Sequence, residues 1–121
     1  MGLCVSAGAA TLVVAWSTFT LSWTHSVEKT EWQEEWQVSA DSLEVTRARI
    51  KGAGAGMEPP ADARLEDGWW VYRPSLPPLP NLILARSDVG EEWRLCHGDD
   101  CLDLYRLAPV DQPVILRPCP Q

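Results

Sequence analysis

From residue 17 onward the chain alternates apolar and polar residues with a period of two. Phe19, Leu21 and Trp23 share one parity, and serines and threonines occupy the positions between them. Such alternation is typical of a strand that buries one side and exposes the other. Residues 32–38 repeat the pattern. The two runs therefore predict a β-hairpin with a polar turn between them.

The second run has a helical alternative. Residues 26–36 are rich in Glu, Lys and Gln, which favour helices, and the spacing of Trp32 and Trp36 suits one helix face. We favour the hairpin because alternation is present on both flanks of the turn. In the hairpin, one face of the second strand carries Trp32, Glu34, Trp36 and Val38.

Residues 43–50 predict a third strand with an interrupted pattern. Arg47 and Arg49 fall on the parity of Leu43 and Val45, so the buried face changes part-way along the run. A change of this kind indicates a β-bulge or a sheet edge.

The remainder of the chain is divided by Gly and Pro into short segments. We expect a surface loop at residues 57–67, an extended segment at 74–80, which contains four prolines, and a hairpin turn at 97–100. Further strands are predicted at residues 68–72, 82–86, 92–96, 102–107 and 114–116. Seven or eight short strands predict an all-β fold, a small antiparallel sandwich or barrel formed by a single domain over residues 17–121.

The first sixteen residues are apolar and carry no charged side chain. Their length suits a signal-peptide core or a membrane anchor, and Ala15-Trp16-Ser17 resembles a cleavage site, although no Lys or Arg precedes Lys29. We therefore expect residues 1–16 to export or anchor the domain and to contact the membrane. The alternative is a first buried strand or helix of the domain itself.

Charge excludes some classes of function. The formal net charge is −7, which argues against non-specific nucleic-acid binding and against adsorption to anionic lipid.

The chain has seven tryptophans and one phenylalanine, and each indole N–H needs a partner when it is buried.

Two of the four cysteines flank the predicted hairpin turn. Cys96 and Cys101 would face each other on paired strands, so we expect a disulfide worth about 2 kcal/mol for so short a loop. The alternative is a zinc site that also uses His97 or Cys119, but the spacing matches no standard zinc pattern. Cys119 then has only Cys4 as a further candidate partner, and its pairing stays open.

The turn of the first hairpin and the strand after it contain residue types that occur in binding and catalytic sites. His25 and Glu34 both lie on the inward parity, where a hydrogen bond between them would satisfy two buried polar groups. We interpret the pair as a lock that fixes the register of the hairpin. The alternatives are a ligand or partner contact and, less favoured, a metal or catalytic site. Ser26 points to the opposite face from His25, so the two do not form a triad, and we expect no enzyme activity and no cofactor.

A second motif is the glycine stretch at residues 52–56. It lacks the Lys-Ser/Thr of a phosphate-binding loop and the spacing of a dinucleotide-binding fingerprint. We expect its glycines to allow positive φ angles where the third strand leaves the sheet.

Three stretches together resemble a bacterial family, domain of unknown function 1850 (DUF1850). They are residues 24–30 (THSVEKT) followed by Glu34, residues 52–57 (GAGAGM) and residues 68–70 (GWW), within roughly residues 19–104. The motif positions that the resemblance carries over are His25, Ser26, Glu28, Glu34, Gly52, Gly54 and Gly56. The chain departs from the family in its charge-free N-terminus and its cysteine-containing C-terminal part.

The resemblance implies a small exported or membrane-anchored protein that faces the periplasm. Such proteins are often encoded beside tripartite ATP-independent periplasmic (TRAP) transporters of the TAXI type. The implied role is accessory to solute uptake, with the TRAP permease or its TAXI solute-binding protein as partner. The alternative function is a stand-alone periplasmic module that binds a small ligand in a Trp-lined interior.

Overall fold

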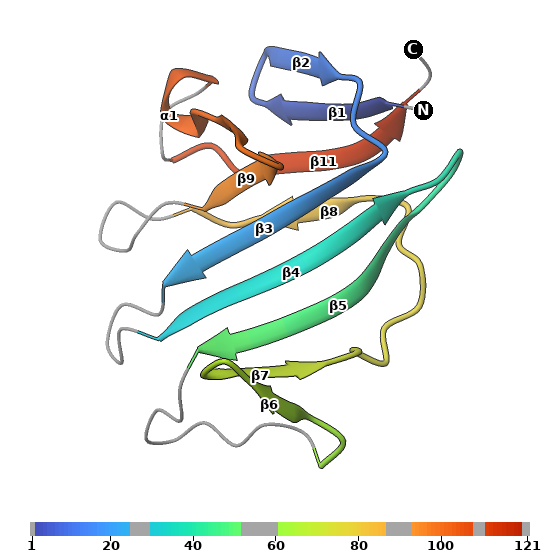
Figure 1. The fold of residues 1–121 in the computed structure, drawn as a ribbon. Coiled ribbons are helices and arrows are strands. Elements are labelled where there is room, and N and C mark those ends of the chain that lie inside the picture. The colour runs from blue at the N-terminus through green and yellow to red at the C-terminus, as the bar shows by residue number, and fades with distance from the viewer. Residues whose placement is uncertain (1, 25–29, 52–60, 87–92, 108–110, 120–121) are drawn as a thin grey trace.

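The described part of the protein folds as two antiparallel β-sheets packed face to face, with one short helix (Figure 1). The structure, a computed structural model, describes residues 2–24, 30–51, 61–86, 93–107 and 111–119. The predicted all-β, sandwich-like architecture is confirmed. In the described ranges there are eleven strands, more than the sequence predicted, and no helix long and apolar enough to cross a membrane.

The larger sheet contains the predicted hairpin. Trp23 lies opposite Trp32 and Phe19 lies opposite Trp36, so residues 31–38 form a strand and not the alternative helix. The sheet has the order β10-β9-β3-β4-β5-β7-β6. Its strands are β3 (Thr18–Thr24), β4 (Glu31–Val38), β5 (Leu43–Lys51), β6 (Arg64–Glu66), β7 (Trp69–Tyr72), β9 (Arg94–His97) and β10 (Asp100–Leu102).

The predicted irregularity in the third strand is a β-bulge. Glu35 pairs with Arg47, but the next residue, Trp36, pairs with Val45, which leaves Thr46 unpaired. The Thr46 hydroxyl donates a hydrogen bond to the Glu35 carbonyl oxygen at 3.1 Å. The extra residue explains why Val45 and Ala48 are both buried although their parities differ.

The smaller sheet joins the two ends of the described chain. Its order is β2-β1-β11-β8, formed by β1 (Gly2–Ala7), β2 (Ala10–Val14), β8 (Leu82–Leu84) and β11 (Val114–Cys119). β1 is the buried strand that the sequence left open as the alternative to a signal or anchor segment. Membrane contact through residues 1–16 stays a prediction.

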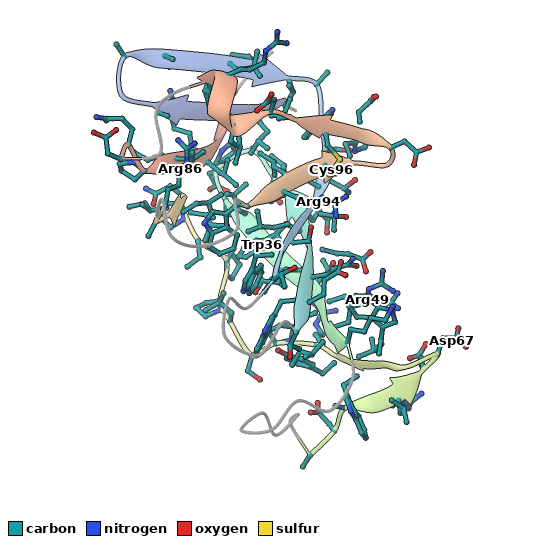
Figure 2. The ribbon with its side chains drawn as sticks, turned by 90° about the vertical axis from the view of Figure 1, so that its left-hand side faces the viewer. Trp36, Arg49, Asp67, Arg86, Arg94 and Cys96 are labelled. Atoms are coloured by element: carbon teal, nitrogen blue, oxygen red, sulfur yellow. A yellow bond between two sulfur atoms is a disulfide. The ribbon has the colours of Figure 1, made fainter. Side chains whose placement is uncertain are left out.

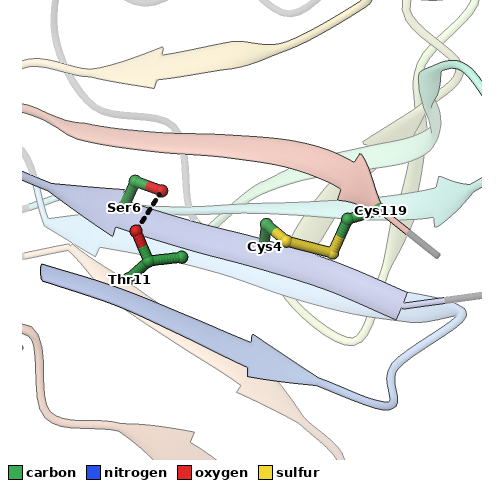
Figure 3. The surroundings of a disulfide bond; sticks show 4 residues. All are labelled: Cys4, Ser6, Thr11 and Cys119. Carbon is green, nitrogen blue, oxygen red and sulfur yellow. Dashed lines mark hydrogen bonds between the residues drawn. A yellow bond between two sulfur atoms is a disulfide. The ribbon is translucent and has the colours of Figure 1, made fainter. Parts of the chain in front are cut away.

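Both disulfides connect neighbouring strands. Cys96 and Cys101 lie opposite each other on β9 and β10 and are bonded, as the sequence predicted. The pairing that the sequence left open is Cys4 with Cys119, which joins β1 to β11 across 115 residues (Figure 3). The Cys96 and Cys101 sulfur atoms are therefore not available as thiolate ligands for zinc.

Two predicted segments differ from the structure. Residues 57–67 were expected to be a loop, but β6 lies within them and pairs with β7 across a turn at Asp67 and Gly68, which have φ angles of 51° and 85°. Residues 102–107 were expected to form a strand, but β10 ends at Leu102 and α1 (Leu104–Leu107) follows. Leu104 and Leu107 are three residues apart and both contact the core, a spacing that suits one helical turn.

The core lies between the sheets. Side chains below 3% exposure come from both layers, and each fully buried Leu or Phe contributes about 1.5–3 kcal/mol. The larger sheet contributes Phe19, Leu21, Trp36, Leu43 and Leu95, and the smaller sheet contributes Leu3, Val5, Leu84, Val114 and Leu116.

Candidate binding site

The inner face of the larger sheet has a second part beyond this core. Towards the ends of β3 and β4 at Thr24 and Glu31, the inward side chains are only half-buried. Two cross-strand rows occupy this part. One row runs Leu95, Leu21, Glu34, Ala48 and Tyr72, and the next runs Trp23, Trp32, Ile50, Trp70 and Leu65.

Three tryptophans pack against one another at this end, and we name them the tryptophan cluster: Trp23, Trp32 and Trp93. The rings of Trp23 and Trp32 stack with centroids 5.7 Å apart and planes 10° from parallel. Trp93 approaches Trp23 at 4.8 Å with a 54° tilt. Both geometries are within the range that aromatic pairs prefer.

The indole N–H groups of Trp93 and Trp32 differ in their hydrogen bonding. Trp93 donates to the Ala85 carbonyl oxygen at 2.7 Å. The Nε1 of Trp32 is buried, and no acceptor for it is found in the part of the chain that the structure describes. An unpaired buried donor costs about 1–3 kcal/mol. A bound acceptor would recover that free energy.

Glu34 lies beside the cluster, between Leu21 and Ala48. Its Oε1 accepts a hydrogen bond from the Nε1 of Trp36 at 3.2 Å. Burial raises the pKa of the Glu34 carboxyl above its usual value of 4.5, although the indole N–H opposes the shift. Burial, and then the negative charge of Glu34, also raise the pKa of the Tyr72 hydroxyl. Aromatic rings beside a carboxyl suit a flat ligand that stacks and accepts or donates a hydrogen bond.

The opposite face of the larger sheet is polar. Figure 2 shows Trp36 and Arg49 on opposite sides of the sheet. Arg49 donates to the Gln33 side-chain oxygen at 2.7 Å, and its guanidinium carbon lies 4.4 Å from the centre of the Trp69 ring. Lys51 lies 5.4 Å from the same ring. This cation–π cluster was missed from the sequence, because Arg49 and Trp69 meet only through the pairing of β5 with β7.

A hollow of about 380 Å³ lies on the same polar face, at the opposite ends of the strands from the tryptophan cluster. His97 contributes to its wall together with Thr18, Glu35 and Gln37. The Nδ1 of His97 lies 2.9 Å from the Thr18 carbonyl oxygen, and the ring stacks on Trp16 at 5.5 Å. His97 is exposed, and these two contacts fix the position of its ring.

The DUF1850 family profile matches residues 19–104, which is well over half of the chain. The chain belongs to the DUF1850 family. Neither the curated proteins nor the solved structures contain a match to it. The family is defined as a domain of unknown function, so membership by itself assigns no reaction.

The DUF1850 match covers the larger sheet except Thr18, the first residue of β3, together with β8, and ends at the start of α1. The strands β1, β2 and β11 lie outside it. Most of the layer that covers the core face therefore comes from outside the matched segment, and the Cys4–Cys119 disulfide lies entirely in this added part.

Most DUF1850 motif positions fall outside the described residues. These are His25, Ser26, Glu28, Gly52, Gly54 and Gly56. The predicted hydrogen bond between His25 and Glu34 therefore stays a prediction. Glu34 itself is described, and it lies on the inward face that the parity predicted, half-buried and on the same side as Trp36.

The tryptophan cluster and the motif segments share one end of the sheet. Thr24 pairs with Glu31, and Lys51 pairs with Trp69, so the segments 25–29 and 52–60 are attached to neighbouring strand ends. Trp69 and Trp70, from the third family stretch, belong to the same region. The end of the larger sheet that carries the tryptophan cluster is therefore the candidate binding site.

Proposed function

We propose that this DUF1850 protein is an exported β-sandwich that assists a TRAP transporter of the TAXI type in solute uptake. The partner would be the permease or its solute-binding protein. Family membership supports the proposal, because the sequence resemblance implies this genomic association. The observation that carries the export part of the proposal is the pair of disulfides, since all four cysteines are bonded.

Disulfides persist in oxidising compartments such as the bacterial periplasm and are rare in the cytosol. Two bridges in a chain of 121 residues therefore favour a location outside the cytoplasm. The wider one fastens β1 to β11 and contributes to the stability of the smaller sheet.

The location is tested by trapping thiols with a membrane-permeable alkylating reagent in intact cells, followed by mass spectrometry. We expect unmodified, disulfide-bonded cysteines at positions 4, 96, 101 and 119. Alkylation of all four in the mature protein would contradict export. A cytosolic thiol protein from the same cells serves as the control for reagent entry.

The partner is tested by purifying the tagged full-length chain from detergent-extracted membranes. We expect the TAXI permease or its binding protein to be enriched over an untagged control strain. Transport by the same permease is then measured after clean deletion of the gene. Unchanged transport, together with no enrichment, would overturn the accessory role.

A second function is favoured by the tryptophan cluster. A stand-alone ligand-binding module would use the half-buried rings of Trp23 and Trp32, the carboxyl of Glu34 and the Nε1 of Trp32, which has no acceptor among the described residues. Stacking would contribute affinity, and the two polar groups would fix orientation.

This alternative is tested with a panel of carboxylates, sugars and divalent metal ions. A ligand should raise the melting temperature and quench tryptophan fluorescence. The matched variant Trp32→Phe keeps an aromatic ring but removes the N–H, so it should weaken binding while the protein stays folded. A panel without any shift, or equal binding by the variant, would count against this site.

A further inference from the structure

The two sheets have four outer edges, and three of them carry features that discourage pairing with another strand. On β6, Arg64 and Glu66 are charged. β10 begins with Asp100 and is tied to β9 by its disulfide. β8 has only three residues and follows closely after Pro80.

The fourth edge is β2, and it has none of these features. Its five residues, ATLVV, include no charge and no proline. Leu12 is 39% exposed and Val13 is 51% exposed. Figure 1 shows β2 at the outside of the smaller sheet. An exposed apolar edge of this kind is a template for another strand.

The register of β1 and β2 tells which backbone groups of β2 are exposed. Ala7 and Ala10 close the two-residue turn, and pairs along an antiparallel ladder alternate between hydrogen-bonded and non-hydrogen-bonded. Ala10, Leu12 and Val14 therefore direct their backbone groups towards β1. Thr11 and Val13 direct their N–H and C=O groups outward, towards the open edge.

The side chains of β2 divide between the two faces. Leu12 lies opposite the core residue Val5 and faces the core side. Thr11 lies opposite Ser6 on the other face, where the two hydroxyls are 3.2 Å apart (Figure 3). Both faces of the edge therefore stay uncharged along its whole length.

A hollow of about 260 Å³ adjoins this edge on the core side. Leu12 lines it together with apolar side chains from the end of β10 and from α1, and Asp103 and Arg106 also contribute. The lining is mostly apolar, so the hollow suits an aliphatic side chain brought in by an added strand.

We propose that β2 pairs antiparallel with β2 of a second copy of this chain, about a two-fold axis through Leu12. Leu12 then lies opposite Leu12 of the second copy as a non-hydrogen-bonded pair, and both fill the region of the hollow. Thr11 and Val13 exchange backbone hydrogen bonds with Val13 and Thr11 of the second copy. The two smaller sheets become one continuous eight-stranded sheet.

A second copy supplies a strand that matches this edge in length and in chemistry. In the two-fold pairing an uncharged strand of five residues meets its own copy, with Leu12 opposite Leu12 and Thr11 opposite Val13, as an isologous interface requires. The net charge of −7 on each copy opposes association, and the repulsion is smallest where the contact surface itself carries no charge.

The oligomeric state of the full chain, with its disulfides intact, tests the proposal by sedimentation velocity over increasing concentration. We expect a monomer–dimer equilibrium. A purely monomeric protein up to about 1 mM, where a contact worth about 4 kcal/mol would be half formed, would overturn the proposal.

Charged substitutions at Leu12 test whether the two-fold axis passes through this residue. Leu12→Lys and Leu12→Glu each place like charges opposite themselves, so each variant alone should be monomeric. An equimolar mixture should recover a dimer, detected as the mixed species by native mass spectrometry. Ile83→Lys is the control, because Ile83 is 61% exposed on the far edge strand β8, and this variant should stay dimeric. Dimers of Leu12→Lys alone, or no recovery in the mixture, would contradict an axis at Leu12.

Cross-linking gives a second readout. The native cysteines are paired, so Leu12→Cys introduces a single thiol that faces its own copy and should oxidise rapidly to a covalent dimer. Ile83→Cys should oxidise much more slowly. Equal rates would argue against β2 pairing, as would a monomer that sediments with phosphatidylglycerol vesicles, which would assign the edge to lipid.

Discussion

Glu34 is a half-buried carboxyl whose neighbours on the adjacent strands are apolar. Leu21 and Ala48 flank it on the neighbouring strands, and among the described side chains the Trp36 indole donates a hydrogen bond to it. Burial outweighs that hydrogen bond, so the pKa of Glu34 is raised. A raised pKa means that the folded protein binds this proton more tightly than the unfolded chain does.

This shift predicts how stability depends on pH. The contribution of Glu34 is fully present below its unfolded pKa, near 4.5, and is lost as pH rises through the raised pKa of the folded state. Glu34→Gln keeps the shape and an acceptor for Trp36 but removes the charge. We expect it to melt a few degrees above the wild type at pH 7 to 8 and close to it near pH 4.

Two measurements make the Glu34 prediction specific. The tyrosinate transition of Tyr72 should move to lower pH in Glu34→Gln, because the nearby negative charge is gone. Glu35→Gln is the control: it removes an exposed ion pair with Arg47 at 3.5 Å, so it should change stability little or slightly lower it. Equal melting of Glu34→Gln and wild type at every pH would contradict the buried-charge explanation.

At the scale of elements, the turns that join paired strands depend on a few backbone positions. The turn between β6 and β7 places Asp67 at φ 51° and Gly68 at φ 85°. Asp-Gly is the residue pair that a two-residue hairpin turn with two positive φ angles prefers. β6 is short and exposed, so this turn largely decides whether it pairs at all.

Gly68→Ala tests the turn. No atom lies within 4 Å of the added Cβ, so the effect is backbone strain alone, about 1 kcal/mol. Asp67→Asn should be tolerated, because Asn adopts positive φ readily. Chemical denaturation measures both. A Gly68→Ala protein as stable as the wild type would show that the turn does not constrain the fold.

At the scale of the whole molecule, the two disulfides differ in how much chain they close. Cys96–Cys101 spans 5 residues, and Cys4–Cys119 spans 115. In the chain-entropy description, the first contributes about 2 kcal/mol and the second about 5 kcal/mol. The long bridge therefore dominates the covalent contribution to stability.

Paired serine substitutions test this difference. The Cys4→Ser/Cys119→Ser variant should lose several kcal/mol of unfolding free energy, and the Cys96→Ser/Cys101→Ser variant should lose about 2 kcal/mol. Urea denaturation under non-reducing conditions compares them. Similar losses in the two variants would contradict the entropic explanation.

The sequence was sufficient to predict the elements whose hydrophobic pattern is local. Alternation predicted β3 and β4, and the change of parity in residues 43–50 predicted a bulge or a sheet edge, which the structure shows to be a bulge at Thr46. β6 was missed although Asp67-Gly68 is a hairpin signal, because its single apolar residue, Leu65, gives no periodicity. β1 was ambiguous because a short apolar run suits a signal segment as well as a buried strand, and its partner β11 lies more than a hundred residues away.

The candidate site was only partly predictable, because it also depends on pairings between strands that are distant in the sequence. Parity placed Glu34 and Trp32 on one face, but the approach of Trp93 to Trp23 depends on the pairing of β3 with β9. The cation–π contact of Arg49 likewise depends on β5 and β7 being neighbours. Long-range pairings of this kind leave no periodic signal in a single sequence.

The bond between Cys4 and Cys119 also has a mechanical consequence. β1 and β11 run antiparallel, with Gly2 opposite Cys119, so tension applied beyond the two cysteines reaches the bridge before it reaches the strands between them. A covalent bond does not yield to the forces that separate strand pairs. A proteolytic machine that pulls the chain from either terminus would therefore stall at this bridge. Degradation of the protein would first require a reductant that cleaves the Cys4–Cys119 disulfide.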